Sequence, residues 1–287
     1  MRLTTAITLL LIGVMNACTQ TNAIDLEACL ARVITNRNYQ PPTPAELARA
    51  RELFEHTLRG DRTAPELKKD WADAGFAFDE VVADKEVLWL VSEPAGKELG
   101  RGWYLFRTNR ASTLALETPH AKNDVHTGMI GLRLFLAGQT RALATSTITR
   151  HRADMAHLDD TFFQAFTLAF AATCPTGLVI QLHGFESRNH DNAHADIIAS
   201  AGTASPESWF SDLVQRLKLN TALVVLAYPH DIKELGGTLN AQGQALHKSG
   251  RCGFVHLEIT EELRQRMTRD SQLRRAFLDA LSVKQTR

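Results

Sequence analysis

The chain has 287 residues, which is enough for one large domain or for a main domain with an appendage. Its 32 basic and 32 acidic residues give a formal net charge of zero, and neither Lys nor Arg forms a long run. This balance argues against electrostatic capture of nucleic acid or of an acidic membrane surface, so we expect no nucleic-acid partner.

The first residues have the pattern of an export signal. Arg2 supplies a positive charge, and residues 9–15 form an apolar stretch that is too short to span a bilayer. Ala17 then precedes Cys18, which resembles a lipoprotein signal in which Cys18 becomes the lipidated N-terminus, although the two residues before Ala17 depart from that signal. Ordinary cleavage nearby is the alternative. In either case we expect residues 1–18 to be a signal segment and the protein to be exported, either periplasmic or anchored to the envelope by a lipid at Cys18.

Export makes disulfides possible, and three cysteines remain after Cys18, namely Cys29, Cys174 and Cys252. An odd number leaves at least one thiol unpaired within the chain. Because the sequence has no Cys-x-x-Cys pair, we expect buried or partly paired cysteines rather than metal ligands.

Two regions differ in their patterns. Residues 19–80 are predicted to be an N-terminal helical extension, because Thr43-Pro44 and Thr63-Ala64-Pro65 are typical of helix starts. Residues 81–287 alternate between strands and helices. The predicted strands are 87–91, 103–106, 114–116, 144–148, 178–182, 222–227 and 253–259, and helices are predicted from 127, from 161, after 205–207 and near the C-terminus. This alternation indicates an α/β fold with a mixed, mostly parallel sheet flanked by helices.

Polar clusters stand where three of the apolar runs stop. Residues 119–124 follow one strand and include His120 and Asp124, His183 follows another, and Glu258 lies in a third beside His256. In open α/β sheets, ligands and catalytic groups gather beyond the carboxyl ends of the strands. Two imidazoles and two carboxylates at that edge would make a mononuclear metal-hydrolase site.

The expected metal ligands are His120, Asp124 and His183, since a zinc hydrolase needs about three protein ligands and one open position for water. His126 is a rival ligand on the same loop. The alternatives are that His120 caps the strand, that Asp124 caps the helix that begins near Thr127, and that His183 is a buried, hydrogen-bonded histidine. A serine-hydrolase oxyanion turn at His183 is disfavoured, because the chain has no Gly-x-Ser-x-Gly elbow.

Glu258 is the expected general base, because a partly desolvated carboxylate beside a metal-bound water can take its proton. The alternative is a salt bridge to Arg264 or Arg150. Arg150 is the expected clamp for a substrate carboxylate, and Asp154 could orient a histidine, although both could belong to a solvated charge cluster.

A further segment, Gly236 to Gln244, is rich in glycine and amides. It is typical of a substrate-binding loop, with Asn240 and Gln242 as the substrate-binding residues, or of a flexible lid.

With these residues assembled, the chain resembles the zinc-carboxypeptidase-like superfamily, and within it the N-formylglutamate amidohydrolase-like group, over about residues 101–266. The resemblance implies a phosphorylase/hydrolase-like α/β fold, zinc held by His120, Asp124 and His183, Glu258 as the base and Arg150 on the substrate carboxylate. This chain departs from the carboxypeptidase pattern in one respect, because its first ligand pair is spaced His-x-x-x-Asp rather than His-x-x-Glu.

The sequence therefore predicts an exported zinc hydrolase that cleaves an amide or peptide bond in a small-molecule or peptide substrate bearing a carboxylate. Two alternatives remain open. One is a non-catalytic envelope binding protein on the same fold, and the other is a metal-dependent esterase or phosphatase.

Overall fold

The computed structural model describes residues 24–34, 38–138, 140–186 and 194–282, so the predicted signal segment and Cys18 lie outside the described residues. The described strands form one mixed sheet with the order β1-β2-β3-β5-β4-β6-β9-β7-β8. The strands are β1 (Ala77–Ala83), β2 (Glu86–Ser92), β3 (Trp103–Arg107), β4 (Leu114–Thr118), β5 (Ala142–Thr145), β6 (Leu178–Phe185), β7 (Ile197–Ser200), β8 (Val225–Ala227) and β9 (Gly253–Thr260).

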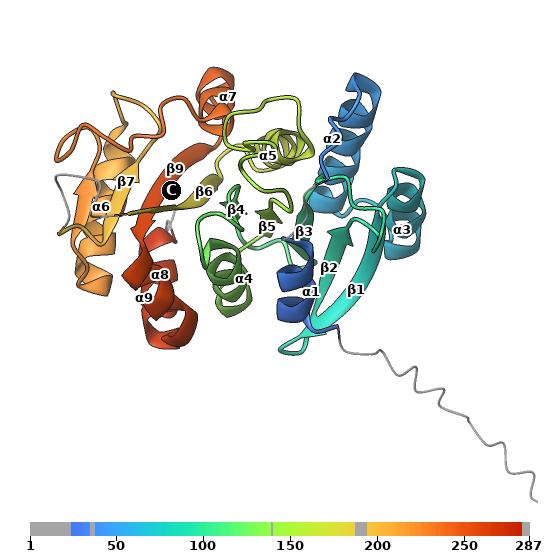
Figure 1. The fold of residues 1–287 in the computed structure, drawn as a ribbon, viewed down its shortest axis with the longest axis horizontal. Coiled ribbons are helices and arrows are strands. Elements are labelled where there is room, and N and C mark those ends of the chain that lie inside the picture. The colour runs from blue at the N-terminus through green and yellow to red at the C-terminus, as the bar shows by residue number, and fades with distance from the viewer. Residues whose placement is uncertain (1–23, 35–37, 139, 187–193, 283–287) are drawn as a thin grey trace, which may run out of the picture.

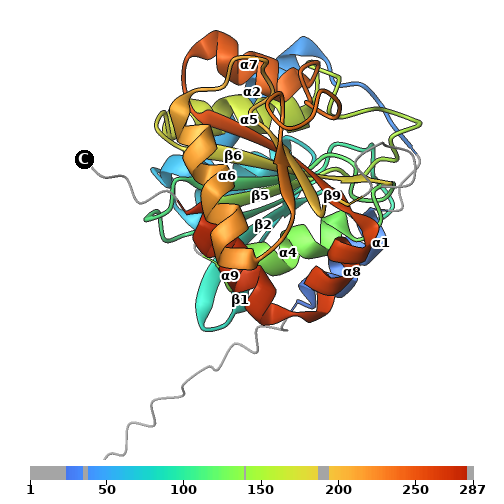
Figure 2. The same ribbon diagram turned by 90° about the vertical axis from the view of Figure 1, so that its left-hand side faces the viewer.

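Helices cover both faces of this sheet (Figures 1 and 2). The helices are α1 (Leu26–Val33), α2 (Pro44–Arg59), α3 (Ala64–Asp73), α4 (Thr127–Ala137), α5 (Phe162–Thr173), α6 (Ser208–Thr221), α7 (Ala241–Ser249), α8 (Glu261–Arg269) and α9 (Ser271–Leu281). One hydrophobic cluster joins α1, α4, α6, α8 and α9 to the sheet, and a second joins α2, α3, α5 and α7 to its other face. The predicted α/β fold with a mixed sheet is confirmed.

Parallel pairing is confined to the middle and one end of the sheet. The central strands β5, β4, β6 and β9 run parallel to one another, and β7 runs parallel to β8. In contrast, β1, β2 and β3 form an antiparallel meander that joins β5, and β7 pairs antiparallel with β9. The carboxyl ends of β4, β6 and β9 therefore meet at one edge.

Two strands were not predicted from the sequence, and two others have different bounds. The strand predicted at 144–148 is β5, which ends at Thr145. β1 is an edge strand that carries Asp79 and Glu80, and β7 has only four residues, so neither gives a long apolar run. The predicted strand 222–227 begins only at Val225, because Ala222 ends α6 in the left-handed conformation (φ 55°).

The N-terminal helices pack on the sheet. The ring of Phe54 in α2 lies 4.7 Å from that of Tyr104 in β3 and 5.6 Å from that of Phe166 in α5. The predicted boundary at residue 80 falls inside β1, which pairs with β2. Helices α2 and α3 thus belong to the same hydrophobic cluster as α5 and α7, whereas α1 belongs to the cluster on the other face of the sheet.

Alternation along the central strands separates apolar from polar side chains. In β6, Leu178, Ile180 and Leu182 belong to the cluster under α4 and α9, and Val179 belongs to the cluster under α5. Because side chains alternate along a strand, Gln181 and His183 share the face of Val179. By the same period, Glu117 in β4 and His256 and Glu258 in β9 lie on that face too, which concentrates polar groups beneath α5 and α7.

Cys29, Cys174 and Cys252 are half-buried and form no disulfide among the described residues. No helix in the described part of the chain is both long enough and apolar enough to cross a membrane.

Candidate metal centre

His120 and Asp124 come from the tight turn between β4 and α4. The backbone N–H of Asp124 donates to the carbonyl of His120 at 2.9 Å, so the chain makes one helical turn that places both side chains on the same side. His120 is 1% exposed and Asp124 9% exposed. The Asp124 side chain does not cap α4, whose N-cap is His126; its Oδ2 accepts the backbone N–H of Gly184 at 3.0 Å.

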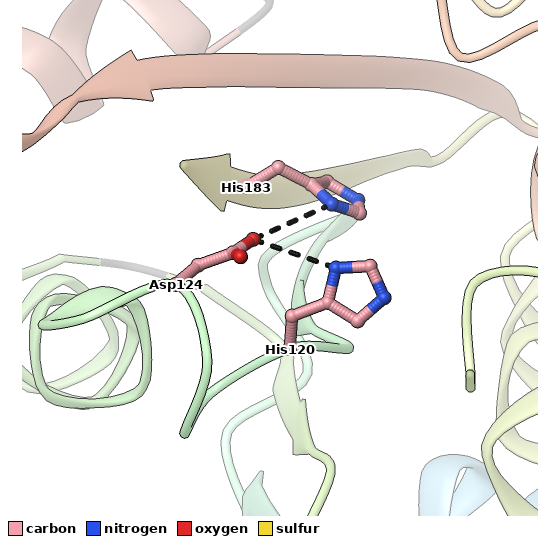
Figure 3. Close-up of side chains that lie close together, drawn as sticks. All are labelled: His120, Asp124 and His183. Atoms are coloured by element: carbon pink, nitrogen blue, oxygen red, sulfur yellow. Dashed lines mark ion pairs between the residues drawn. The ribbon is translucent and has the colours of Figure 1, made fainter. Parts of the chain in front are cut away.

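One carboxylate oxygen faces both imidazoles (Figure 3). Asp124 Oδ2 lies 3.4 Å from His120 Nδ1 and 3.8 Å from His183 Nδ1. The three side chains offer ligand atoms that all lie within 4.8 Å of one another. His183 is 4% exposed, so all three side chains of the cluster are largely buried.

The other nitrogen of each imidazole is held by a neighbouring side chain. His120 Nε2 lies 2.7 Å from Asp154 Oδ1, and His183 Nε2 lies 2.9 Å from Gln181 Oε1. His120 Nδ1, in contrast, is buried without a hydrogen-bond partner in the described structure. Metal-binding histidines commonly donate one ring N–H to a carboxylate or carbonyl and use the other nitrogen for the ion, so these residues fit a cation.

The protonation of the two histidines differs. Burial lowers the pKa of His183 well below its usual range, and the nearby His256 and His120 lower it further, so His183 is neutral at neutral pH. Burial also lowers the pKa of His120, but its contacts with Asp124 and Asp154 outweigh burial and leave that pKa raised. Burial opposes the ionised form of Asp154, yet the hydrogen bond with His120 keeps the pKa of Asp154 well below its usual value. A cation at Nδ1 of His120 would replace a proton that these carboxylates attract.

Glu258 in β9 is the register partner of His183 in the neighbouring strand β6. Its Oε1 lies 3.1 Å from Nε2 of His256, and its side chain is 12% exposed. No ion pair joins Glu258 to Arg264 or Arg150 among the described interactions. His183, His256 and Glu258 form a second cluster within 4.8 Å, but His183 Nε2 is already occupied by Gln181, so His183 has one nitrogen to give.

A cavity of about 170 Å³ opens onto these groups. Its walls include the three expected metal ligands and Glu258, together with Arg150, His157 and Asn240. A larger cavity of about 350 Å³ lies at the opposite edge of the sheet near Trp209 and Leu281, but none of its lining residues is titratable. The smaller cavity is therefore the candidate site.

The remaining predicted residues differ in position. Arg150 is half-exposed at the cavity mouth and its Nε donates to Asp154 Oδ2 at 3.1 Å. Asn240 lines the cavity as the N-cap of α7. Gln242 is fully buried below it and does not line the cavity, and His126 lies outside the cluster.

Sequence reasoning did not assign a role to Gln181, Glu117 or His256. A signal was present for each of them, since each is a polar residue inside an otherwise apolar strand.

No protein-family model matches the chain, and no curated protein matches it. Among solved structures, the chain is similar to a bacteriophage poly-gamma-glutamate hydrolase, with 14% identity, a TM-score of 0.39, and 61% of this chain and 85% of that chain covered. It is also similar to a metallo-carboxypeptidase from Burkholderia cenocepacia (11% identity, TM-score 0.38, 75% and 67% covered). A third is an aspartoacylase family protein from Mesorhizobium loti (15% identity, TM-score 0.41, 73% and 67% covered). The functional argument rests on the geometry of the site.

Proposed function

We propose that this chain is a zinc-dependent hydrolase that cleaves an amide or peptide bond in a small substrate bearing a carboxylate. The observation that carries this proposal is the shared arrangement of His120 and His183, each with Nδ1 toward Asp124 Oδ2 and Nε2 held by another side chain. Two imidazoles and one carboxylate with room beside them match the donor set of a catalytic zinc.

His120, Asp124 and His183 would hold the ion. A bound zinc would polarise the scissile carbonyl and lower the pKa of a water molecule at the site. The protein's own groups supply the rest of the chemistry.

Glu258 is placed to move protons. Its carboxylate lines the same cavity as the three ligands and is held on one oxygen by His256 Nε2. It takes a proton from the attacking water and passes it to the leaving amine, which is the general acid–base role expected of a carboxylate in a closed site. Its 12% exposed side chain limits competition from bulk water.

Arg150 is the group that recognises the substrate carboxylate. Its Nε is bound to Asp154, which fixes the base of the guanidinium at the rim of the cavity. The planar fork beyond can offer paired hydrogen bonds to a carboxylate. The cavity volume of about 170 Å³ suits the end of a peptide or an N-acyl amino acid better than a bulky polymer face.

We also propose that the mature protein is exported, because residues 1–18 have the pattern of a signal segment. Mass spectrometry of the protein from the native envelope would give the mature N-terminus. A chain that still begins at Met1 would contradict export.

The proposal is tested by Glu258→Gln in zinc-loaded protein assayed against N-acyl amino acids and wall-type peptides. We expect turnover to fall by about three orders of magnitude or more while zinc stays bound. Full activity in the variant would contradict the assignment of the base. Activity on esters or phosphates but not on amides would favour the esterase or phosphatase alternative, and binding without turnover would favour a binding protein.

A further inference from the structure

Beneath the candidate metal centre lies a hydrogen-bonded network of buried side-chain amides, one of which contacts His183. Gln181 lies two residues before His183 in β6 and is fully buried. Its amide nitrogen donates to Glu117 Oε2 at 2.8 Å and to Gln242 Oε1 at 2.9 Å. Its amide oxygen accepts from Asn240 Nδ2 at 2.7 Å and lies 2.9 Å from His183 Nε2.

Two backbone groups fix which way the side-chain amides of Gln242 and Asn240 point. The Met155 carbonyl, which can only accept, lies 3.0 Å from Gln242 Nε2, so the oxygen of Gln242 points toward Gln181. The Gly243 N–H, which can only donate, lies 2.9 Å from Asn240 Oδ1, so the nitrogen of Asn240 points toward Gln181. Gln181 must therefore point its amide nitrogen toward Gln242, and its amide oxygen toward Asn240 and the imidazole of His183.

Glu117 completes the clamp on the nitrogen of Gln181. It is fully buried in the neighbouring strand β4, and its other oxygen lies 2.6 Å from Thr167 Oγ1. Because Glu117 offers an accepting oxygen at that point, a flipped Gln181 would place two oxygens against each other. A glutamine at position 117 could keep the same accepting oxygen.

The tautomer of His183 follows from this arrangement. A neutral imidazole carries one ring proton, and the Gln181 oxygen can only accept it at Nε2. The competing acceptor is Asp124 Oδ2, 3.8 Å from Nδ1. A proton on Nδ1 would block the atom that must be unprotonated to bind a cation.

We infer that Gln181 is a positioning residue, which, anchored by Glu117, Gln242 and Asn240, holds the proton of His183 on Nε2 and leaves the lone pair of Nδ1 toward Asp124. The inference deepens the proposed function and rests on it only for the zinc that His183 would hold. Its physical content, the tautomer, exists in the metal-free protein.

The test is a long-range ¹H–¹⁵N spectrum of metal-free protein labelled with ¹⁵N-histidine, with His183 assigned by comparison with His183→Ala. The wild-type protein should give the Nε2–H tautomer. In Gln181→Met the proton should move toward Nδ1, because Asp124 becomes the remaining acceptor, and zinc affinity measured by chelator competition should fall about 10- to 100-fold.

Gln164→Met is the matched control. Gln164 is also buried and accepts from Gln242 Nε2 at 2.9 Å, but the Met155 carbonyl still orients Gln242 without it. This variant should lose stability as Gln181→Met does and keep both the tautomer and the zinc affinity. Glu117→Gln should also keep both.

An Nδ1–H tautomer in the wild-type protein would overturn the inference without any variant. An unchanged tautomer and zinc affinity in Gln181→Met would overturn it as well. If the wild-type protein binds no zinc, the proposed function fails, and the spectra of the metal-free proteins still decide the role of Gln181.

Discussion

Replacing Glu117 by Gln should remove a large pH dependence of folding stability. Burial raises the pKa of Glu117 from its usual 4.5 to about 7, although hydrogen bonds from Thr167 and Gln181 oppose the rise. Because the pKa is higher in the folded state, the folded protein holds a proton that the unfolded chain has lost between these values. Stability from this group is therefore present in full below about pH 4.5 and is lost as the pH rises toward 7.

The size of the effect follows from the two pKa values. The gap from 4.5 to about 7, at about 1.4 kcal/mol per pKa unit, corresponds to about 3.5 kcal/mol, most of it between pH 5 and pH 8. Glu117→Gln carries a neutral amide at every pH. The unfolding free energy of the wild-type protein minus that of the variant should thus fall by about 2 to 3 kcal/mol as the pH rises over that range.

Urea unfolding at pH 5, 6, 7 and 8 measures this difference, with Glu80→Gln, an exposed carboxyl on β1, as the matched control. A difference for Glu117→Gln that is no steeper with pH than the difference for the control would refute the argument that the Glu117 carboxyl is buried and protonated in the folded protein.

Three further predictions concern the site. Asp154→Asn removes the charge bound to His120 Nε2 and should weaken zinc binding about 10-fold by chelator competition; unchanged affinity would mean that Asp154 does not support the ligand. Arg150→Ala should raise KM about 10- to 100-fold for a substrate with a free carboxylate and leave KM unchanged for the amidated analogue of that substrate. An equal rise in KM for both substrates would show that Arg150 does not recognise the carboxylate. Gly184→Ala would place a Cβ against the guanidinium of Arg264, which is 4% exposed and has little room to move away. The variant should therefore lose about 1 to 3 kcal/mol of unfolding free energy in urea, and no loss would mean that Arg264 does not pack there.

The position of the candidate ligands at one edge of the sheet could be predicted from the sequence. His120, Asp124 and His183 each follow an apolar run, and parallel strands carry such residues to a common edge. The structure places their ligand atoms within 4.8 Å because β4 and β6 are neighbours, and β9 adds Glu258 on the other side of β6.

The support of that site could not be predicted, because it depends on strand order and helix placement. Gln181 meets Glu117 only because β6 lies beside β4, and it meets Gln242 only because α7 packs over β6 and β9. The segment interpreted as a binding loop begins α7, so Asn240 caps a helix and Gln242 faces the core. The alternate polar residues Gln181 and His183 in β6, and His256 and Glu258 in β9, were a visible signal of one polar face. The residues that anchor Gln181, however, lie 59 or more positions away in the chain.

The zinc content of purified protein tests the central claim most directly. Elemental analysis of the wild-type protein, prepared without chelators, should find about one zinc per chain, and His183→Ala prepared in parallel should have lost it. A wild-type protein that holds no zinc, even after zinc is added back and the excess removed, would contradict the account.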